Sequence, residues 1–68
     1  MATAWRISRE GDLVAELDVR EEGGGVIVAT TMGEATKPYR FTSLEAADTF
    51  VRDLTASFAY LGCDVVAG

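Results

Sequence analysis

The first half of the chain alternates apolar and polar residues in the manner of β-strands. Residues 13–20 show the clearest alternation, which predicts a half-buried strand with its odd-numbered positions facing a core. The inward side chains are expected to be Leu13, Ala15, Leu17 and Val19, and the outward ones Val14, Glu16, Asp18 and Arg20. Residues 3–9 alternate in the same way, with Trp5 and Ile7 inward, and predict a first strand.

Glycine and proline divide the remaining strand-like segments. Glu10-Gly11-Asp12 predicts a short turn, and residues 21–25 predict a second, looser hairpin connection. Residues 26–32 are apolar on both faces, which is typical of a strand that is central or covered on both sides. Residues 33–38 are polar and predict a loop that ends at Pro38, followed by a short strand over residues 39–41. Residues 63–66 fit either a fifth strand or a packed tail.

A change of period after residue 42 predicts an amphipathic helix. Thr42 and Glu45 have the spacing of a capping box, in which each side chain satisfies a free backbone donor. Gly62 fits the position just after the helix end. Apolar residues behind the cap recur three and four apart and would face the core: Leu44, Ala47, Val51, Leu54, Phe58 and Leu61, widened by Phe50.

These elements predict an α+β fold in a single domain over residues 1–68. We expect an antiparallel meander of three to five strands with one C-terminal amphipathic helix, about residues 43–61, packed on one face. The predicted core comprises the helix stripe and Trp5, Ile7, Leu13, Ala15, Leu17 and Val19. Because a core of this size is marginal, both a monomer and a homodimer are consistent with the sequence.

Charge narrows the classes of partner. The chain has 68 residues with 6 Lys+Arg and 11 Asp+Glu, a net charge of −5. Residues 10–34 contain one base, Arg20, and seven acids: Glu10, Asp12, Glu16, Asp18, Glu21, Glu22 and Glu34. Such a negative potential disfavours direct binding to nucleic acid and favours a protein partner with a basic surface. The alternative is that these acids only form a solvated face that keeps the domain soluble.

Catalytic and metal-binding chemistry is poorly represented. With no His and one Cys, the chain lacks an imidazole base and a Cys/His zinc site. Glu16 and Asp18 would stand about 6.8 Å apart on one strand face, a separation known from glycosidases. Their neighbours are polar and acidic, however, rather than the apolar pocket that general acid catalysis requires. We therefore expect no enzyme activity, no metal site and no cofactor.

Three further motifs have simple structural interpretations. Gly23-Gly24-Gly25 precedes a strand and follows two glutamates, so it is expected to be a hairpin tip and not a phosphate-binding loop. Tyr39 and Phe41 flank Arg40 in the manner of a base-stacking platform, but packing under the helix is the favoured interpretation in so acidic a chain. Cys63 has no nearby base and is expected to be a structural thiol.

The acidic segment suggests a functional hypothesis. Glu10 and Asp12 would lie at one end of the second strand, Glu16 and Asp18 along it, and Glu21 and Glu22 at the other end. A series of carboxylates at that spacing is similar in charge and rise to a nucleic-acid backbone. A protein that presents it can occupy an Arg/Lys surface meant for DNA or RNA. The sequence thus favours a non-catalytic acidic inhibitor of a nucleic-acid-handling protein.

In size, acidity and element order, the whole chain resembles the small anti-CRISPR proteins of phages and mobile elements. Several of these are single domains that act without chemistry, by covering the DNA-binding or guide-binding surface of an interference complex. The resemblance implies that the basic partner is a Cas protein, and it involves no signature residues.

A second resemblance is to the HicB-type antitoxins. Residues 24–28, Gly-Gly-Val-Ile-Val, and residues 42–47, Thr-Ser-Leu-Glu-Ala-Ala, look like their Gly-Gly strand and the start of their helix. The Pro-Gly-Cys segment of that family is replaced here by Met32-Gly33-Glu34. This resemblance implies a module that neutralises a partner toxin. A small structural or assembly protein is the third hypothesis.

No stretch of the sequence is apolar for the roughly 20 residues that a membrane span requires. Residues 1–6 also lack the basic start and apolar segment of a signal peptide. The expected location is therefore the cytoplasm of a bacterium, or of the host cell if the protein is phage-encoded, with no membrane partner.

Overall fold

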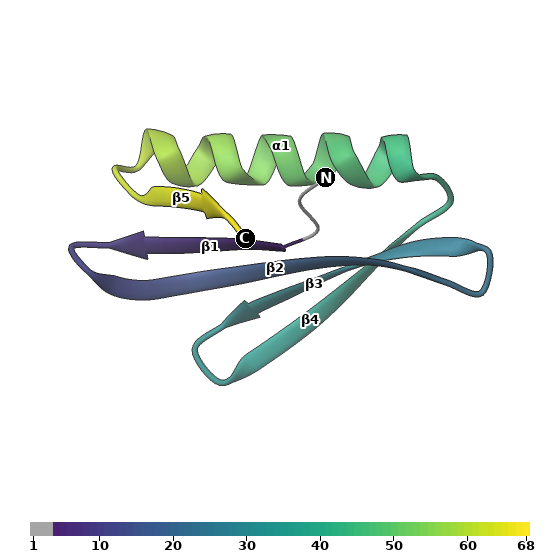
Figure 1. Ribbon diagram of the computed structural model, residues 1–68, viewed down its shortest axis with the longest axis horizontal. Helices are drawn as coiled ribbons and strands as arrows, with labels where there is room; N and C mark the ends of the chain where they lie inside the picture. Colours follow the sequence, from purple (N-terminus) through teal and green to yellow (C-terminus); the bar gives the residue numbers. More distant parts are fainter. Residues whose placement is uncertain (1–3) are drawn as a thin grey trace.

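The computed structural model describes residues 4–68, which form a five-stranded sheet with one helix lying across it (Figure 1). The elements in chain order are β1 (Ala4–Arg9), β2 (Asp12–Glu22), β3 (Gly25–Met32), β4 (Ala35–Phe41), α1 (Leu44–Tyr60) and β5 (Asp64–Ala67). Thr3, where the predicted first strand begins, and the first three of the residues used to look for a signal peptide lie outside the described residues.

The sheet is an antiparallel meander closed at one side by the last strand. Its spatial order is β4-β3-β2-β1-β5, and every neighbouring pair is antiparallel. The helix carries the chain from β4 at one edge to β5 at the other, where β5 pairs with β1. The α+β meander predicted from the sequence is therefore confirmed, and the segment predicted over residues 63–66 as a strand or a packed tail forms a strand at Asp64–Ala67.

Tight two-residue turns connect the first four strands. Glu10 and Gly11 both have positive φ angles, 53° and 85°, and so do Gly23 and Gly24, at 59° and 80°. Two consecutive positive φ angles are typical of a type I′ turn, whose twist matches that of the flanking strands. The connection at residues 21–25 is thus as tight as the first turn, and the prediction of a looser one was wrong.

A β-bulge in β2 changes the predicted faces of that strand. If β2 contained no extra residue, the two-residue turn at Glu10 and Gly11 would place Ile7 opposite Val14. Ile7 would then lie on the same face of the sheet as the outward-facing residues of β2. One extra residue in β2 shifts the register between Ile7 and Ser8, so that Ile7 lies opposite Ala15. Leu13 is consequently exposed, while Val14 packs against the core, which reverses the prediction for both residues.

Pro38 lies inside a strand, although the sequence predicted a loop over residues 33–38. Strand β4 extends over Ala35–Phe41 and is an edge strand. Met32 and Ala35 flank the two-residue turn as a hydrogen-bonded pair, so the Ala29–Pro38 pair further along is of the non-bonded kind. The Pro38 nitrogen therefore points away from β3, and the missing N–H disrupts no ladder bond.

The core lies between α1 and the face of the sheet beneath it. Ile7, Leu17 and Val28 are the largest side chains that are almost fully buried, and the helix adds Ala47 and Val51. Trp5, Val19, Phe50, Leu54 and Phe58 are half-buried against this cluster. The ends of the predicted helix stripe, Leu44 and Leu61, lie at the two ends of α1 and remain 45% and 62% exposed.

The helix begins one residue later than predicted. Ser43, with an extended backbone (φ −145°, ψ 156°), is the N-cap, and its hydroxyl accepts a 3.1 Å hydrogen bond from the Ala46 N–H. The Thr42–Glu45 capping box is therefore wrong, since Glu45 occupies the second helical position. At the other end, Gly62 has φ 91°, as expected. The Gly62 N–H donates to the Ala59 carbonyl and the Cys63 N–H to the Phe58 carbonyl, which forms a Schellman motif.

Candidate partner-binding face

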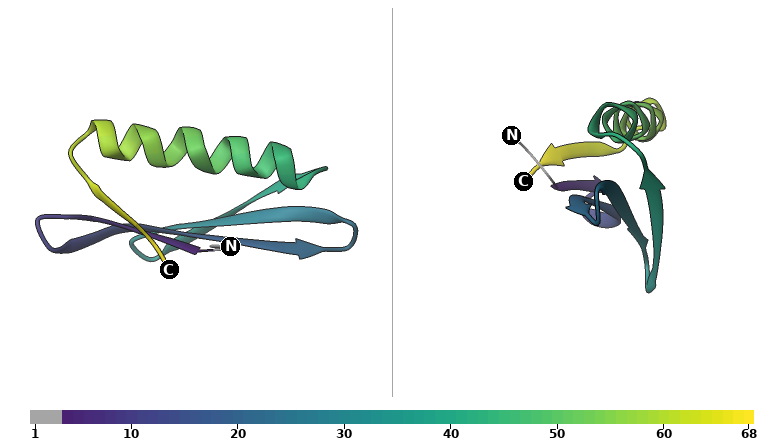
Figure 2. Two further views of the ribbon diagram at one scale, coloured as in Figure 1. Left: turned by 45° about the horizontal axis from the view of Figure 1, so that its top comes forward. Right: turned by 90° about the vertical axis from the view of Figure 1, so that its right-hand side faces the viewer.

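The side of the sheet away from α1 is not covered by any element of residues 4–68 (Figure 2). We call this side the open face. Because partners in an antiparallel sheet lie on the same side, the strand register assigns its residues in rows that cross the strands. One row is Arg6, Glu16, Thr31 and Thr36, the next is Ala4, Asp18, Ala29 and Pro38, and a third is Arg20, Ile27 and Arg40.

Glu16 and Asp18 occupy the middle of the open face. Both are exposed, and neither has a cationic group within 4.0 Å among the described residues. Asp18 lies between two alanines, Ala4 and Ala29, whose small side chains leave its carboxylate standing clear. Together with Thr31, these residues line an open hollow of about 320 Å³. The hollow leaves both carboxylates accessible to a group from another molecule.

Three arginines share the open face: Arg6 and Arg20, whose alternation with core residues predicted an outward position, and Arg40, which the sequence did not assign to it. Arg6 on β1 lies opposite Glu16, and Arg40 on β4 lies in the same row as Arg20. The Arg20 Nε lies 3.8 Å from the Glu22 carboxylate, and both side chains are more than half exposed, so this ion pair contributes little to stability. The open face is therefore mixed in charge, with its unpaired carboxylates in the middle.

Two of these arginines, Arg20 and Arg40, flank Ile27 on the open face. Its side chain is only 5% exposed although it is on the open face, apart from the main core. Its cross-strand neighbours are Arg20 and Arg40, whose aliphatic stems can cover an apolar side chain while their charged ends stay in water. The apolar pattern of residues 26–32 thus has two causes, the core under α1 on one side and this arginine-flanked isoleucine on the other.

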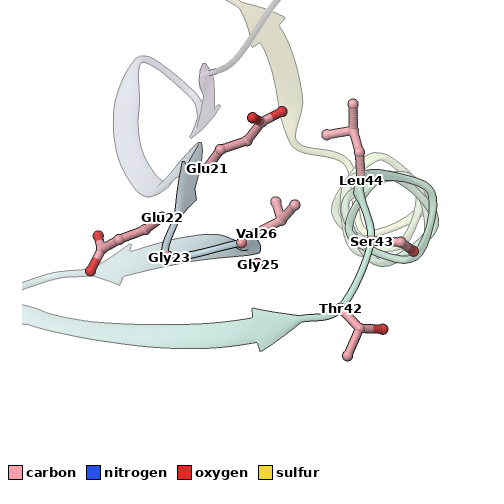
Figure 3. Close-up of a pocket in the computed structure, with 9 residues that line it drawn as sticks. Glu21, Glu22, Gly23, Gly25, Val26, Thr42, Ser43 and Leu44 are labelled. Atoms are coloured by element: carbon pink, nitrogen blue, oxygen red, sulfur yellow. The ribbon is translucent and has the colours of Figure 1, made fainter.

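The other predicted site residues lie at the hairpin turns. Glu10 and Asp12 are at the β1–β2 turn and Glu34 is at the β3–β4 turn. Glu21 and Glu22 end β2 and point to opposite sides of it (Figure 3). The sheet therefore brings Glu16, Asp18 and Glu22 to one face but leaves the remaining acids at separate turns, so the seven acids do not form one continuous surface.

The glycine-rich turn lies beside the start of α1, a proximity that the sequence did not predict. Residues 21–26 and 42–44 line a hollow of about 390 Å³ between them (Figure 3). Each glycine has a structural reason to be there. Gly23 and Gly24 form the turn, and a Cβ on Gly25 would come within 3.1 Å of the Phe41 carbonyl oxygen. The glycines are thus explained without a phosphate ligand.

The aromatic pair near Arg40 packs inward. The rings of Tyr39 and Phe41 lie 5.0 and 5.2 Å from the ring of Phe50 on α1, so they belong to the helix contact. Cys63 is half-buried at the helix end. Residues 4–68 contain no group of three or more His, Cys, Asp or Glu side chains placed to hold a metal ion.

Comparisons with known proteins found no matching family model, no matching curated protein and no matching solved structure. Within residues 4–68, α1 has neither the length nor the apolar character to cross a membrane.

Proposed function

We propose that this protein is a non-catalytic inhibitor that binds the basic surface of a nucleic-acid-handling protein, such as a CRISPR interference complex. The observation that supports this proposal is the position of Glu16 and Asp18, which are exposed and unpaired in the middle of a sheet face that no described element covers. Two carboxylates about 6.8 Å apart match the spacing of neighbouring basic side chains on a partner strand or helix.

The mixed charge of the open face refines this proposal. Arg6, Arg20 and Arg40 surround the carboxylate pair on the sheet, so an extended nucleic-acid backbone is imitated only over a short distance. The complementary partner surface has Arg or Lys opposite Glu16 and Asp18, with acidic groups around them. Such a pattern selects one partner among many basic proteins, because a uniformly basic surface would meet the arginines unfavourably.

Charge reversal with a matched control tests this proposal. In the double variant Glu16→Lys/Asp18→Lys, we expect binding to a purified interference complex, and inhibition of its DNA binding, to fall at least about tenfold. The control Glu45→Lys/Asp53→Lys changes net charge equally on the exposed outer surface of α1 and should bind as the unmodified protein does. Affinity should also fall as salt rises. Equal binding by both double variants would contradict the proposal.

An antitoxin-like module is a second candidate function. The two segments that resemble HicB-type antitoxins, residues 24–28 and 42–47, include residues that line one hollow beside the start of α1 (Figure 3). In this case the binding surface would be the hairpin and helix start rather than the open face. Binding of a small toxin that is lost in Leu44→Glu and retained in Glu16→Lys/Asp18→Lys would favour the antitoxin function.

A further inference from the structure

The two edges of the sheet differ in their capacity to pair with another strand. An edge strand exposes unpaired N–H and C=O groups, which natural proteins commonly block. On β4, the outward-facing positions include Pro38, which has no N–H to offer, and its neighbour Lys37 is charged and exposed. Strand β5, at the opposite edge, contains neither Pro nor Lys. Its edge is therefore the one in the described structure that retains a full set of donors and acceptors.

One hydrogen bond shows which backbone groups of β5 face outward. The Gly68 N–H donates to the Ala4 carbonyl at 2.9 Å, which makes that position a hydrogen-bonded pair in the β1–β5 ladder. Because bonded and non-bonded pairs alternate, Val66 also faces β1, whereas Val65 and Ala67 direct their N–H and C=O groups away from the sheet. Two donors and two acceptors thus lie along the free edge.

The side chains along β5 leave this edge accessible. Val66 is on the open face beside Arg6 and is 58% exposed. Ala67 is small and exposed, and Val65 is half-buried under α1. The single charged residue of the strand, Asp64, lies at its far end. Among residues 4–68, no bulky or charged side chain of β5 therefore lies between the outward groups and an incoming strand.

We propose that β5 pairs antiparallel with β5 of a second copy of this chain, with Val66 opposite Val66 of that copy. In this register Val65 of each copy lies opposite Ala67 of the other, so each copy donates two hydrogen bonds and accepts two. All the outward groups at Val65 and Ala67 are satisfied, and the two exposed Val66 side chains meet at a non-bonded pair, where side chains approach most closely.

This register also separates the two Asp64 side chains. The two Asp64 side chains lie at opposite ends of the new strand pair and do not face each other.

The two-fold axis of the dimer runs perpendicular to the sheet, so the dimer has one continuous sheet with both helices on the same side. Both open faces then lie on the other side, and a partner with two basic sites would be bound bivalently. The dimer itself does not depend on the proposed inhibitor function.

A pair of edge variants tests the dimer without any partner. Because the paired strand is only four residues long, we expect a weak, reversible dimer in sedimentation equilibrium between about 10 μM and 1 mM. Ala67→Pro removes an outward N–H and no bond to β1, and it should raise the dissociation constant at least about tenfold. Thr36→Pro removes an outward N–H at the β4 edge and should leave the dimer unchanged.

A cysteine variant tests the register. In a Cys63→Ser background, Val66→Cys should form an intermolecular disulfide under mild oxidation, because non-bonded antiparallel pairs have Cα atoms about 4.5 Å apart, which is within disulfide reach. Asp53→Cys on the outer surface of α1 should stay reduced. The proposal is wrong if the unmodified protein is monomeric at about 1 mM, or if Ala67→Pro and Thr36→Pro dimerise equally. Equal disulfide yields at positions 53 and 66 would contradict the register.

Discussion

Among residues 4–68, Thr30 has a buried side-chain oxygen without a hydrogen-bond partner. The residue is 6% exposed. It lies on the face under α1, opposite Leu17 in the strand register. A buried hydroxyl without a partner loses its bonds to water and gains nothing in return. A β-branched apolar residue would suit this position better than threonine does.

Thr30→Val should therefore stabilise the protein by about 1 kcal/mol, since it keeps the shape of the side chain and removes the unpaired hydroxyl. The free energy of unfolding in urea measures the effect. Thr31→Val is the matched control on the other face of the same strand, where the hydroxyl pairs with Thr36 at 3.0 Å, and it should not stabilise. A Thr30→Val variant less stable than the unmodified protein would show that the hydroxyl has a partner in solution.

At the scale of the element, the ends of α1 show the limits of local sequence patterns. Thr42 and Ser43 are adjacent, and both are good N-cap residues. The capping-box spacing to Glu45 favoured Thr42 as the N-cap. However, β4 continues to Phe41 and the backbone is still extended at Ser43, so Ser43 is the N-cap. The position of the cap thus depends on where the preceding strand delivers the chain. Gly62 was predictable because its left-handed φ is a local requirement.

Ser43→Ala should destabilise the protein by about 1 kcal/mol, because the Ala46 N–H loses its hydroxyl acceptor. Thr42→Ala should change stability by only a few tenths of a kcal/mol, since Thr42 lies outside the helix. Thermal unfolding of the two variants, followed by circular dichroism, gives the comparison. The reverse order of destabilisation would place the cap at Thr42, as the capping-box pattern predicted.

At the scale of the whole molecule, stability depends on one thin core between α1 and the sheet. Leu17 on β2 is 1% exposed in the middle of this core, whereas Leu54 on α1 is half-buried. The helix stripe is therefore the outer layer of the core, and the sheet contributes its largest buried side chains. A domain of this size has little stability to spare.

Leu17→Ala should cost about 3–5 kcal/mol and leave a large unfolded fraction at 25 °C, because the cavity lies in the centre of the core. Leu54→Ala should cost about 2 kcal/mol, since part of that side chain already contacts water. Urea unfolding midpoints and one-dimensional proton NMR spectra distinguish the two. Equal losses would mean that α1 and the sheet contribute equally to the core.

The sequence alone determined the kinds of element and most of their positions. Alternation identified β1 and β2, the apolar period identified α1, and Gly11, Gly24 and Gly62 identified turns and a helix end. These features depend on the conformation of a residue and its near neighbours, so local patterns contain the information. The acids of β2 were predicted to lie along one strand for the same reason, and they do.

Only the tertiary structure decided which residues share the open face. The bulge at Val14 shifts the register so that Arg6 faces Glu16, and the pairing of β3 with β4 adds Arg40 to the row of Arg20. The crossing of α1 places β5 at an edge where its outward groups are free. Such neighbours are distant in sequence, and their proximity results from packing the whole sheet against one helix, which no local period encodes.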